Sequence, residues 1–169
     1  MTPPTIRATI RTAAESDVDA LVDNTWAVAM EGTGIATEVP FDREDRRRRM
    51  LEGIGDDVHS GCFVAEVDGR VVAHIGLRLA PYGVVSLGML VIDGYRDQGI
   101  GGALMARGIE WARSSGGHKV SLEVWSHNEA ALALYRHTGF EEEGRLRRHY
   151  RRRNGELWDA IVMGLLLRP

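Results

Sequence analysis

A glycine-rich turn between an apolar strand and a helix is the feature that most constrains how this chain of 169 residues folds. Residues 91–104 read VIDGYRDQGIGGAL, so the apolar end of a strand runs into the turn and the turn runs into helix-forming residues. Backbone N–H groups in the first turn of a helix have no intrahelical acceptor and carry partial positive charge. Glycines at positions 99, 101 and 102 leave these N–H groups accessible to an anion, and Arg96 adds a cation. The turn therefore predicts a phosphate site.

Two common phosphate-binding turns are excluded. The single lysine of the chain, Lys119, lies outside the turn, and the P-loop pattern G-x-x-x-x-G-K-[ST] is absent. The glycines do not form G-x-G-x-x-G, and no first strand of a dinucleotide-binding unit precedes them. The pattern that remains is Arg96-x-x-Gly99-x-Gly101. The predicted phosphate-binding segment comprises Arg96, Asp97, Gln98, Gly99, Ile100, Gly101 and Gly102.

A second patterned segment, NEAALALYRHTGF, occupies residues 128–140. Asn128 is a favourable N-cap, and the alanine-rich residues after it favour a helix. Ala131, Leu134 and Tyr135 fall on one face of that helix. Gly139 ends it as a left-handed cap. Taken alone, Tyr135 would be a core aromatic residue of an amphipathic helix.

In their order along the chain, the two segments resemble the signatures of the GCN5-related N-acetyltransferase (GNAT) family. Those signatures are Arg/Gln-x-x-Gly-x-Gly/Ala and then N-x-x-A-x-x-x-Y-x-x-x-G-F. The resemblance implies that acetyl-CoA binds as co-substrate, with its pyrophosphate on the turn. In the family, the strand that corresponds to Met89, Leu90 and Val91 pairs through its backbone with the pantetheine arm, and one N–H there polarises the thioester oxygen. The resemblance also places Asn128, Ala131 and Tyr135 at the cofactor.

The pattern of apolar residues and turn signals predicts a single N-acetyltransferase domain over residues 1–169, with residues 1–5 as a loose tail. Strands are expected at 6–11, 62–67, 71–79, 84–92, 120–124, 140–150 and 157–167, and helices at 16–30, 42–53, 99–115 and 128–138. Ser16 and Asp42 are the expected caps of the first two helices. Asp68-Gly69 and Asn154-Gly155 predict hairpin turns. The order β-α-α-β-β-β-α-β-α-β-β predicts an α/β fold of GNAT type, with a mixed, mostly antiparallel sheet flanked by helices on both faces.

Composition and residue spacing exclude several classes of function. A net charge of -3 gives no electrostatic argument for nucleic acid. No apolar run is long enough to cross a membrane, and the N-terminal region is acidic without an apolar leader, so a cytoplasmic protein is expected. The histidines lack metal-ligand spacing, so no metal site is expected. Cys62 lies in an apolar segment and is expected to be buried and unreactive.

Acetyl transfer to an amine needs a neutral amine, a polarised carbonyl and a proton for the departing thiolate. Tyr135 stands at the position of the family's thiolate-protonating tyrosine, and a neutral phenol is a proton donor. Glu123 lies mid-strand and points away from Leu122 and Val124, toward the other layer or a cleft, where the pKa of a carboxylate tends to rise. The run Leu-Glu-Val…Asn…Tyr also resembles that of family members that acetylate N-terminal amines. Tyr135 is thus the predicted acid and Glu123 the predicted base.

Other interpretations stay open at this point. Glu123 is alternatively a solvated residue or an ion-pair partner, and a water chain is an alternative base. The run 46–49, four arginines, predicts a solvated helix with local ion pairs, or else contact with an anionic acceptor or the phosphates of coenzyme A. The basic stretch 145–153 borders either the acceptor cleft or a dimer contact. Trp125 is a candidate for the acceptor pocket, and His127 lies next to the presumed cofactor cleft.

The function that follows is an acetyl-CoA-dependent N-acetyltransferase that works by direct attack. Cys62 lies far from the motifs and lacks an activating pattern, so a covalent enzyme intermediate is not expected. The expected acceptor is a primary amine of a small molecule: an amino acid, a polyamine or an amine antibiotic. A peptide or protein N-terminus is the alternative acceptor, and a non-catalytic CoA-binding module is the alternative class. A homodimer is expected, with an edge strand such as the last one as a possible contact.

Overall fold

The computed structural model describes residues 7–55 and 57–167. The predicted loose tail and the first residue of the predicted N-terminal strand lie outside the described residues. The elements are β1 (Thr9–Thr12), a 3-10 turn η1 (Glu15–Asp17), α1 (Val18–Met30), α2 (Arg43–Glu52), β2 (Ser60–Val67), β3 (Arg70–Leu79), β4 (Val84–Val91), α3 (Ile100–Ser114), β5 (Lys119–Trp125), α4 (Glu129–His137), β6 (Glu141–Arg151) and β7 (Leu157–Leu166). Each predicted helix and strand is present, with its ends shifted by a few residues.

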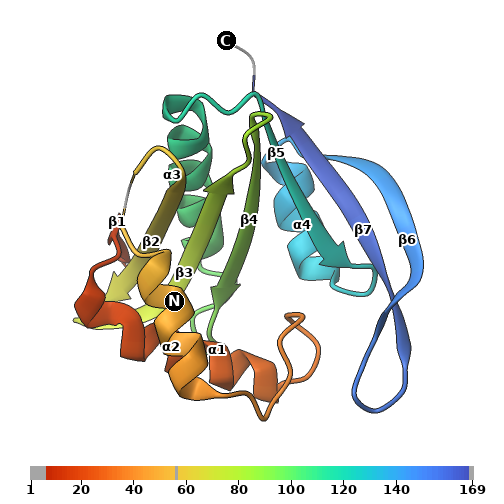
Figure 1. The fold of residues 1–169 in the computed structure, drawn as a ribbon, viewed down its shortest axis with the longest axis horizontal. Coiled ribbons are helices and arrows are strands. Elements are labelled where there is room, and N and C mark those ends of the chain that lie inside the picture. Colours follow the sequence, from red (N-terminus) through yellow and green to blue (C-terminus); the bar gives the residue numbers. More distant parts are fainter. Residues whose placement is uncertain (1–6, 56, 168–169) are drawn as a thin grey trace, which may run out of the picture.

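The strands form one sheet in the order β1-β2-β3-β4-β5-β7-β6. The last strand, β7, pairs with both β5 and β6, so the prediction that it is an edge strand is wrong. Every neighbouring pair is antiparallel except β4 and β5, which are parallel. Helices α1 and α2 cover one face, and α3 and α4 cover the other (Figure 1). The predicted mixed, mostly antiparallel sheet with helices on both faces is therefore confirmed.

The pairing of β4 with β5 is short. The two strands are in register only where Val84–Ser86 faces Lys119–Ser121. Beyond this point they diverge, and the β5-facing backbone of residues 87–90 has no strand partner in the described part of the chain. The strands open toward the glycine-rich turn at one end of β4 and toward α4 after β5 (Figure 1). The gap thus lies between the glycine-rich turn and the segment 128–140, the two segments that the sequence analysis singled out.

Local sequence explains most of the turns and caps. Asp68 and Gly69 both have positive φ, 48° and 77°, as a tight hairpin turn between β2 and β3 requires. The Asp42 side chain accepts a hydrogen bond from the Asp45 N–H and caps α2, as predicted. The predicted cap at Ser16 is wrong. Ser16 lies inside the 3-10 turn η1, and the N-cap of α1 is Asp17, which makes no side-chain cap hydrogen bond. The Asp17 carboxylate instead accepts from the N–H of Ala14, the residue before η1, at 2.8 Å.

The core lies mainly between the sheet and α3. Leu104 and Trp111 of α3 are buried, and Ile109 is half-buried. Trp111 packs on Gly61 of β2, where an added Cβ would lie 2.9 Å from the indole ring. This close packing fixes α3 on the sheet and thereby fixes where the N-terminus of α3 points.

Cys62 is buried on the opposite face, beneath α1 and α2, as predicted. Burial raises the pKa of its thiol to about 11, so the thiol is protonated near neutral pH.

None of the helices in the described part of the chain combines the length and the apolar character that a bilayer crossing requires.

Candidate active site

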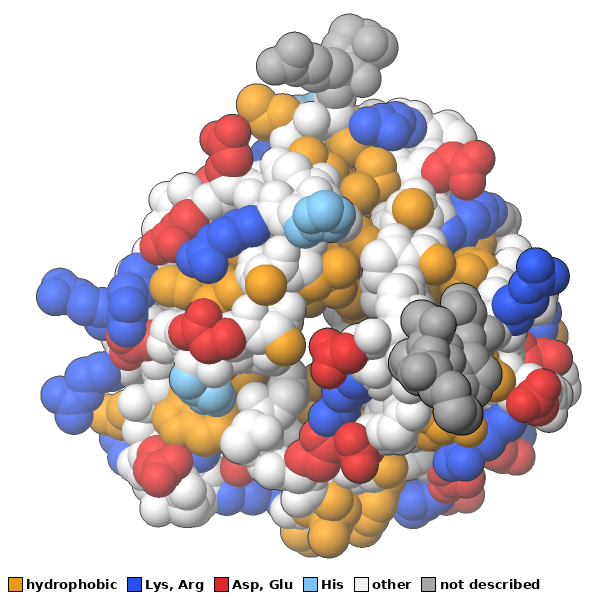
Figure 2. All heavy atoms as spheres, turned by 180° about the vertical axis from the view of Figure 1, so that it is seen from behind, with side chains coloured by type: hydrophobic (Ala, Val, Ile, Leu, Met, Phe, Trp, Pro, Cys, Tyr) orange, Lys and Arg blue, Asp and Glu red, His pale blue; other side chains and the backbone are white. Residues whose placement is uncertain are grey.

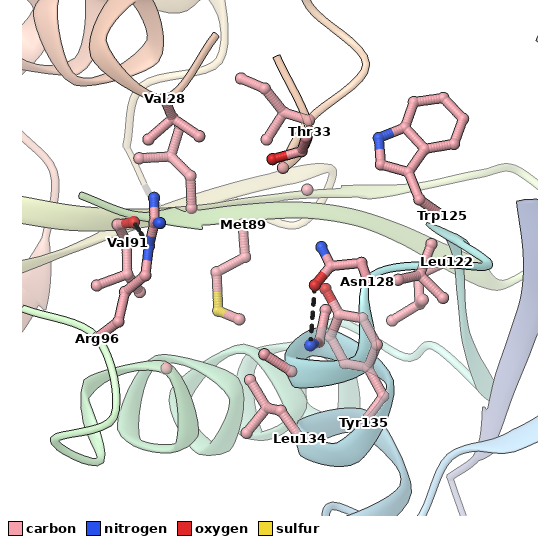
Figure 3. A pocket seen from close by; sticks show the side chains of 18 of the residues that line it. Val28, Thr33, Met89, Val91, Arg96, Leu122, Trp125, Asn128, Leu134 and Tyr135 are labelled. Atoms are coloured by element: carbon pink, nitrogen blue, oxygen red, sulfur yellow. Dashed lines mark hydrogen bonds between the residues drawn. The ribbon is translucent and has the colours of Figure 1, made fainter. Parts of the chain in front are cut away.

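A cavity of about 690 Å³ lies in the gap between β4 and β5 and reaches the start of α3 (Figure 3). Twelve of the predicted site residues line it: Met89, Leu90, Val91, Arg96, Asp97, Gly99, Gly101, Gly102, Glu123, Asn128, Ala131 and Tyr135. Two predicted residues do not. The Gln98 side chain donates to the Gly94 carbonyl instead, and Ile100 is buried in the core.

The N-terminus of α3 has the geometry of an anion site. Gly99 is its N-cap, with φ of 79°, a left-handed conformation that glycine adopts without strain. An added Cβ at Gly99 or Gly102 would meet nothing within 4 Å, so the space in front of the first helical N–H groups is open. The first turn carries no acidic residue. Its N–H groups and the helix dipole are therefore free to act on a bound anion.

Arg96 is held in place at the edge of this site. Its Nε donates to the Val91 carbonyl at 2.9 Å, and its guanidinium forms a 2.7 Å ion pair with Glu31. The hydrogen bond to Glu31 raises the pKa of Arg96 above its ordinary value. Glu31 lies in the loop after α1 and also lines the cavity. The predicted cation is present, but a carboxylate offsets part of its charge.

Tyr135 reaches from α4 into the cavity (Figure 3). The residue is 7% exposed, and its ring packs on Phe140 at a centroid distance of 5.8 Å. Burial raises the pKa of Tyr135 to about 12. The phenol is therefore protonated at neutral pH and available as a hydrogen-bond and proton donor.

Asn128 caps α4, because its side chain accepts from the Ala131 N–H at 3.2 Å (Figure 3). The cap role read from the sequence is confirmed. The Asn128 side chain also lines the cavity beside Tyr135, and its amide N–H₂ group is not used by the cap. A contact with the pantetheine arm stays a prediction.

Glu123 lines the cavity from β5, and its side chain is exposed. The predicted orientation toward a cleft is confirmed. The Tyr150 hydroxyl of β6 donates a hydrogen bond to the Glu123 carboxylate, and this bond raises the pKa of Tyr150 to about 12. Tyr150 is a site residue that the sequence did not indicate, since no motif surrounds it and only the β6–β7 hairpin brings it to β5.

Aromatic rings form a wall beside Glu123. Trp125 makes edge contacts with Tyr150 and Trp158, at centroid distances of 4.9 Å and 5.3 Å. Arg152 is 5% exposed and lies 4.4 Å above the Trp158 ring. Trp125 and His127 line the cavity, so the predicted places of both at the cleft are confirmed.

The loop between α1 and α2 is joined to the β6–β7 turn on this side of the cavity. The Arg152 guanidinium donates to the Ala36 carbonyl at 3.0 Å, and the Arg153 guanidinium donates to the Pro40 carbonyl at 2.8 Å. The Arg153 N–H also donates to the Glu38 carboxylate. The basic stretch 145–153 thus borders the cleft, which was one of its two predicted roles.

The arginine run on α2 divides into two kinds of residue. Arg47 pairs with Asp19, and Arg48 and Arg49 pair with Asp45, as expected of a solvated helix. Arg46 departs from that expectation, because it is half-buried and has no carboxylate at ion-pair distance among the described residues.

The surface away from the cavity carries charged side chains of both signs. Figure 2 shows acidic and basic side chains interspersed over the face that carries α3 and α4. Within residues 7–55 and 57–167, no group of three or more His, Cys, Asp or Glu side chains is placed to hold a metal ion.

Comparison with known proteins places this site in a family context. Residues 25–140 match the model of the family described as Acetyltransferase (GNAT) family. The chain is 38% identical over 99 residues to N-alpha-acetyltransferase RimI of Mycobacterium tuberculosis, which covers 55% of this chain and 60% of that protein. It is 34% identical over 109 residues to the L-amino acid N-acetyltransferase AaaT of Escherichia coli, which covers 60% of this chain and 65% of that protein. The chain thus spans less than two thirds of either relative.

The fold is also similar to solved structures. The Salmonella typhimurium protein yncA, determined with its cofactor acetyl-CoA, matches with a TM-score of 0.81 at 23% identity. The match covers 95% of this chain and 94% of that chain.

Proposed function

Because the chain belongs to the acetyltransferase (GNAT) family, whose members use acetyl-CoA, we propose that it moves the acetyl group of acetyl-CoA to the primary amine of a small molecule. We propose that residues 1–169 act as one N-acetyltransferase domain. The observation that carries the proposal is the open gap between β4 and β5, which runs from the anion site at α3 to Tyr135 and Glu123. A homodimer and a cytoplasmic location stay predictions from the sequence.

The described residues fit acetyl-CoA along the length of this cavity. The N–H groups at Gly99–Gly102 would hold the diphosphate. The unpaired backbone of residues 87–90 would accept the pantetheine arm as an added strand, because it lacks a partner on the β5 side. Acetyl-CoA supplies an acetyl thioester at the inner end of this path.

The chemistry that we assign to the chain is direct transfer. Glu123, exposed at the cleft, takes a proton from the acceptor ammonium, and the neutral nitrogen attacks the thioester carbon. A β4 N–H stabilises the charge that develops on the carbonyl oxygen. As the C–S bond breaks, Tyr135 gives its proton to the sulfur and regains one from solvent. The amine nitrogen loses its second proton, so the products are an amide, a free thiol and one released proton.

A small acceptor is favoured over a peptide N-terminus by the loop between α1 and α2. Hydrogen bonds from Arg152 and Arg153 join this loop to the β6–β7 turn beside the cavity. We propose that the joined loop obstructs the path along which a peptide would leave. The peptide alternative has support of another kind, since the mycobacterial relative is named an N-alpha-acetyltransferase. Parallel assays with free amines and with short peptides separate the two.

Thiol release tests the proposed reaction. We expect the protein to release free thiol from acetyl-CoA in the presence of at least one amine of a pooled panel, with the N-acetylated amine identified by mass spectrometry. Acetyl-CoA binding without thiol release on any amine or peptide would instead favour a non-catalytic CoA-binding module.

Replacing Glu123 with glutamine is expected to shift the rate profile toward high pH, where amines lose their proton unaided. The same change removes the carboxylate that raises the pKa of Tyr150, so that pKa should fall toward the ordinary tyrosine value. Initial rates over a pH series and ultraviolet titration of tyrosine measure the two effects. An unchanged rate profile together with a lowered Tyr150 pKa would assign the base to another group or to a water chain.

Replacing Glu31 with glutamine is expected to tighten acetyl-CoA binding by up to about fivefold. The change removes a negative charge from the cavity wall and frees the charge of Arg96, and partly exposed charges contribute about 0.2–1 kcal/mol. Titration calorimetry at low and high salt measures the effect, which should shrink as salt rises. Weaker binding would mean that holding Arg96 in place matters more than the charge of Glu31.

A further inference from the structure

A second cavity, of about 360 Å³, lies between the sheet and the two helices α1 and α2. Gly76 of β3 and Gly88 of β4 are cross-strand partners and form part of its floor. A Cβ added at either glycine would meet nothing within 4 Å. Glycine weakens a strand interior, so a pair of facing glycines with empty space above them marks a position where something other than the chain fits.

Arg46 supplies positive charge to this cavity from α2. Its guanidinium donates to the Thr37 hydroxyl at 3.1 Å and lies 5.1 Å from the centre of the Phe41 ring. Burial and the neighbouring Arg49 lower the pKa of Arg46, while Asp45 acts in the opposite direction. The Asp45 carboxylate is bound to Arg48 and Arg49, so Arg46 has no carboxylate of its own among the described residues. A half-buried cation of this kind has lost part of its hydration, and no paired carboxylate compensates for that loss.

His74 adds a second polar group that lacks a partner. It lies on β3 and lines the cavity, and its Nδ1 is shielded from solvent without a hydrogen-bond partner among the described residues. Burial, with the charge of Arg46, lowers the pKa of His74 to about 4, so its ring is neutral at pH 7. A neutral imidazole is able to donate one hydrogen bond. Arg46 and the Thr37 hydroxyl thus supply the cavity with donors for an anion, and His74 adds a neutral polar ring to its wall.

The second cavity adjoins the reaction site. Both cavities are lined by Ile35 and by residues 88–90 of β4. Ser86 pairs with Ser121 in the parallel register, so the residues two positions further on, Gly88 and Glu123, belong to the same face of the sheet. A molecule bound beneath α1 and α2 therefore lies next to the catalytic gap, on the face of the sheet to which Glu123 belongs.

Building on the proposed function, we propose that Arg46, together with Thr37 and His74, binds the carboxylate of the acceptor, so that the acceptor is a free α-amino acid. A carboxylate pairs with Arg46 and supplies the counter-charge that the fold does not provide. A polyamine, or an amine antibiotic without an acidic group, brings only positive charge, which Arg46 repels. Among the acceptors that the sequence left open, the positive charge of Arg46 therefore favours the amino acid.

The test compares three acceptors in Arg46→Gln and in the wild type. They are L-leucine, its carboxamide, and isoamylamine, which lacks the carboxyl group. We expect kcat/KM for leucine to fall by about 10- to 100-fold in Arg46→Gln, since a charge-assisted hydrogen bond is lost, while the values for the other two change less than about threefold. The same three-compound series built on L-methionine and on L-phenylalanine covers the case in which the protein prefers another side chain on the acceptor. Comparing variant with wild type for each acceptor cancels differences in amine reactivity.

Arg48→Gln is the matched control, because Arg48 lies on the same helix and pairs only at its surface. The kcat/KM values for all three acceptors should stay near those of the wild type in this variant. Gly76→Val is a second, independent variant, because Gly76 lines the cavity and a Cβ added there meets nothing within 4 Å. It should raise KM for amino acids and leave the dissociation constant of acetyl-CoA unchanged.

The outcomes separate this proposal from the proposed function. Equal losses for leucine, its carboxamide and isoamylamine in Arg46→Gln, or no loss for any of them, would overturn carboxylate recognition while acetyl transfer stands. If no amine releases thiol, the proposed function fails, and amino-acid binding is then measured by calorimetry with CoA-loaded protein. Binding of leucine to wild type but not to Arg46→Gln would still support the carboxylate site, and equal or absent binding in both would overturn it.

Discussion

Replacing Gly102 with aspartate is expected to weaken acetyl-CoA binding by roughly 100-fold, equivalent to about 2.7 kcal/mol, without lowering the stability of the fold. Gly102 is in the first turn of α3 and lines the cavity, and a Cβ added there meets no atom within 4 Å. A carboxylate at this position would place negative charge where the diphosphate is proposed to bind. The same charge is favourable for the helix itself, because it lies at the positive end of the dipole.

Calorimetry with acetyl-CoA measures the loss of affinity in Gly102→Asp, and thermal unfolding of the same protein measures the stability of its fold. Gly102→Asn is the matched control, since asparagine has nearly the size of aspartate without the charge, and it should lose much less affinity. Wild-type affinity in Gly102→Asp would place the diphosphate elsewhere. A large loss in both variants would indicate obstruction by the side chain instead of repulsion by charge.

Replacing Tyr135 with phenylalanine is expected to lower kcat by roughly 10- to 1000-fold, the span of a single acid–base group. The ring and its packing on Phe140 are kept, and only the hydroxyl is removed. The affinity for acetyl-CoA should therefore change little. Since the pKa of Tyr135 is raised to about 12, the acid form persists well above neutral pH, and the loss should be constant between about pH 6 and 10.

Initial rates at saturating acetyl-CoA over this pH range check the prediction, with calorimetry as the measure of binding. Tyr150→Phe is a useful comparison, because it removes the other hydroxyl at the cleft, the one bonded to Glu123. Wild-type turnover in Tyr135→Phe would remove this residue from the mechanism. A loss that disappears at high pH would assign Tyr135 to proton removal from the amine instead of proton donation to the sulfur.

The fold was predictable because local chemistry marks most element ends. Asp68-Gly69 and Asp42 act through their immediate neighbours, and the structure confirms both. The segment from Gly99 to Gly102 combines a left-handed N-cap with open space, properties that follow from glycine itself. The cap at Ser16 was wrong because a 3-10 turn over Glu15–Asp17 precedes α1 and places Ser16 inside it, whereas the cap rule assumes that the α-helix starts directly after the cap.

The sequence did not single out Tyr150, Arg152 or Arg46 within their basic stretches, because each reaches the site through long-range contacts. Tyr150 meets Glu123 only because β6 and β5 both flank β7. Arg152 is buried between Trp158 of the next strand and Trp125, which lies far from it in the sequence, within a stretch that reads only as basic. Arg46 differs from its three arginine neighbours through the direction in which it leaves α2, and a run of identical residues carries no signal for that difference.

The most direct measurement is a calorimetric comparison of acetyl-CoA with acetyl-pantetheine, which carries the same thioester and arm but lacks the diphosphate. If the N-terminus of α3 holds the diphosphate, acetyl-CoA should bind at least about 100-fold more tightly to the wild type. This difference should largely vanish in Gly102→Asp. Equal affinity for the two compounds, or no heat with acetyl-CoA, would contradict the proposed cofactor site and the reaction that depends on it.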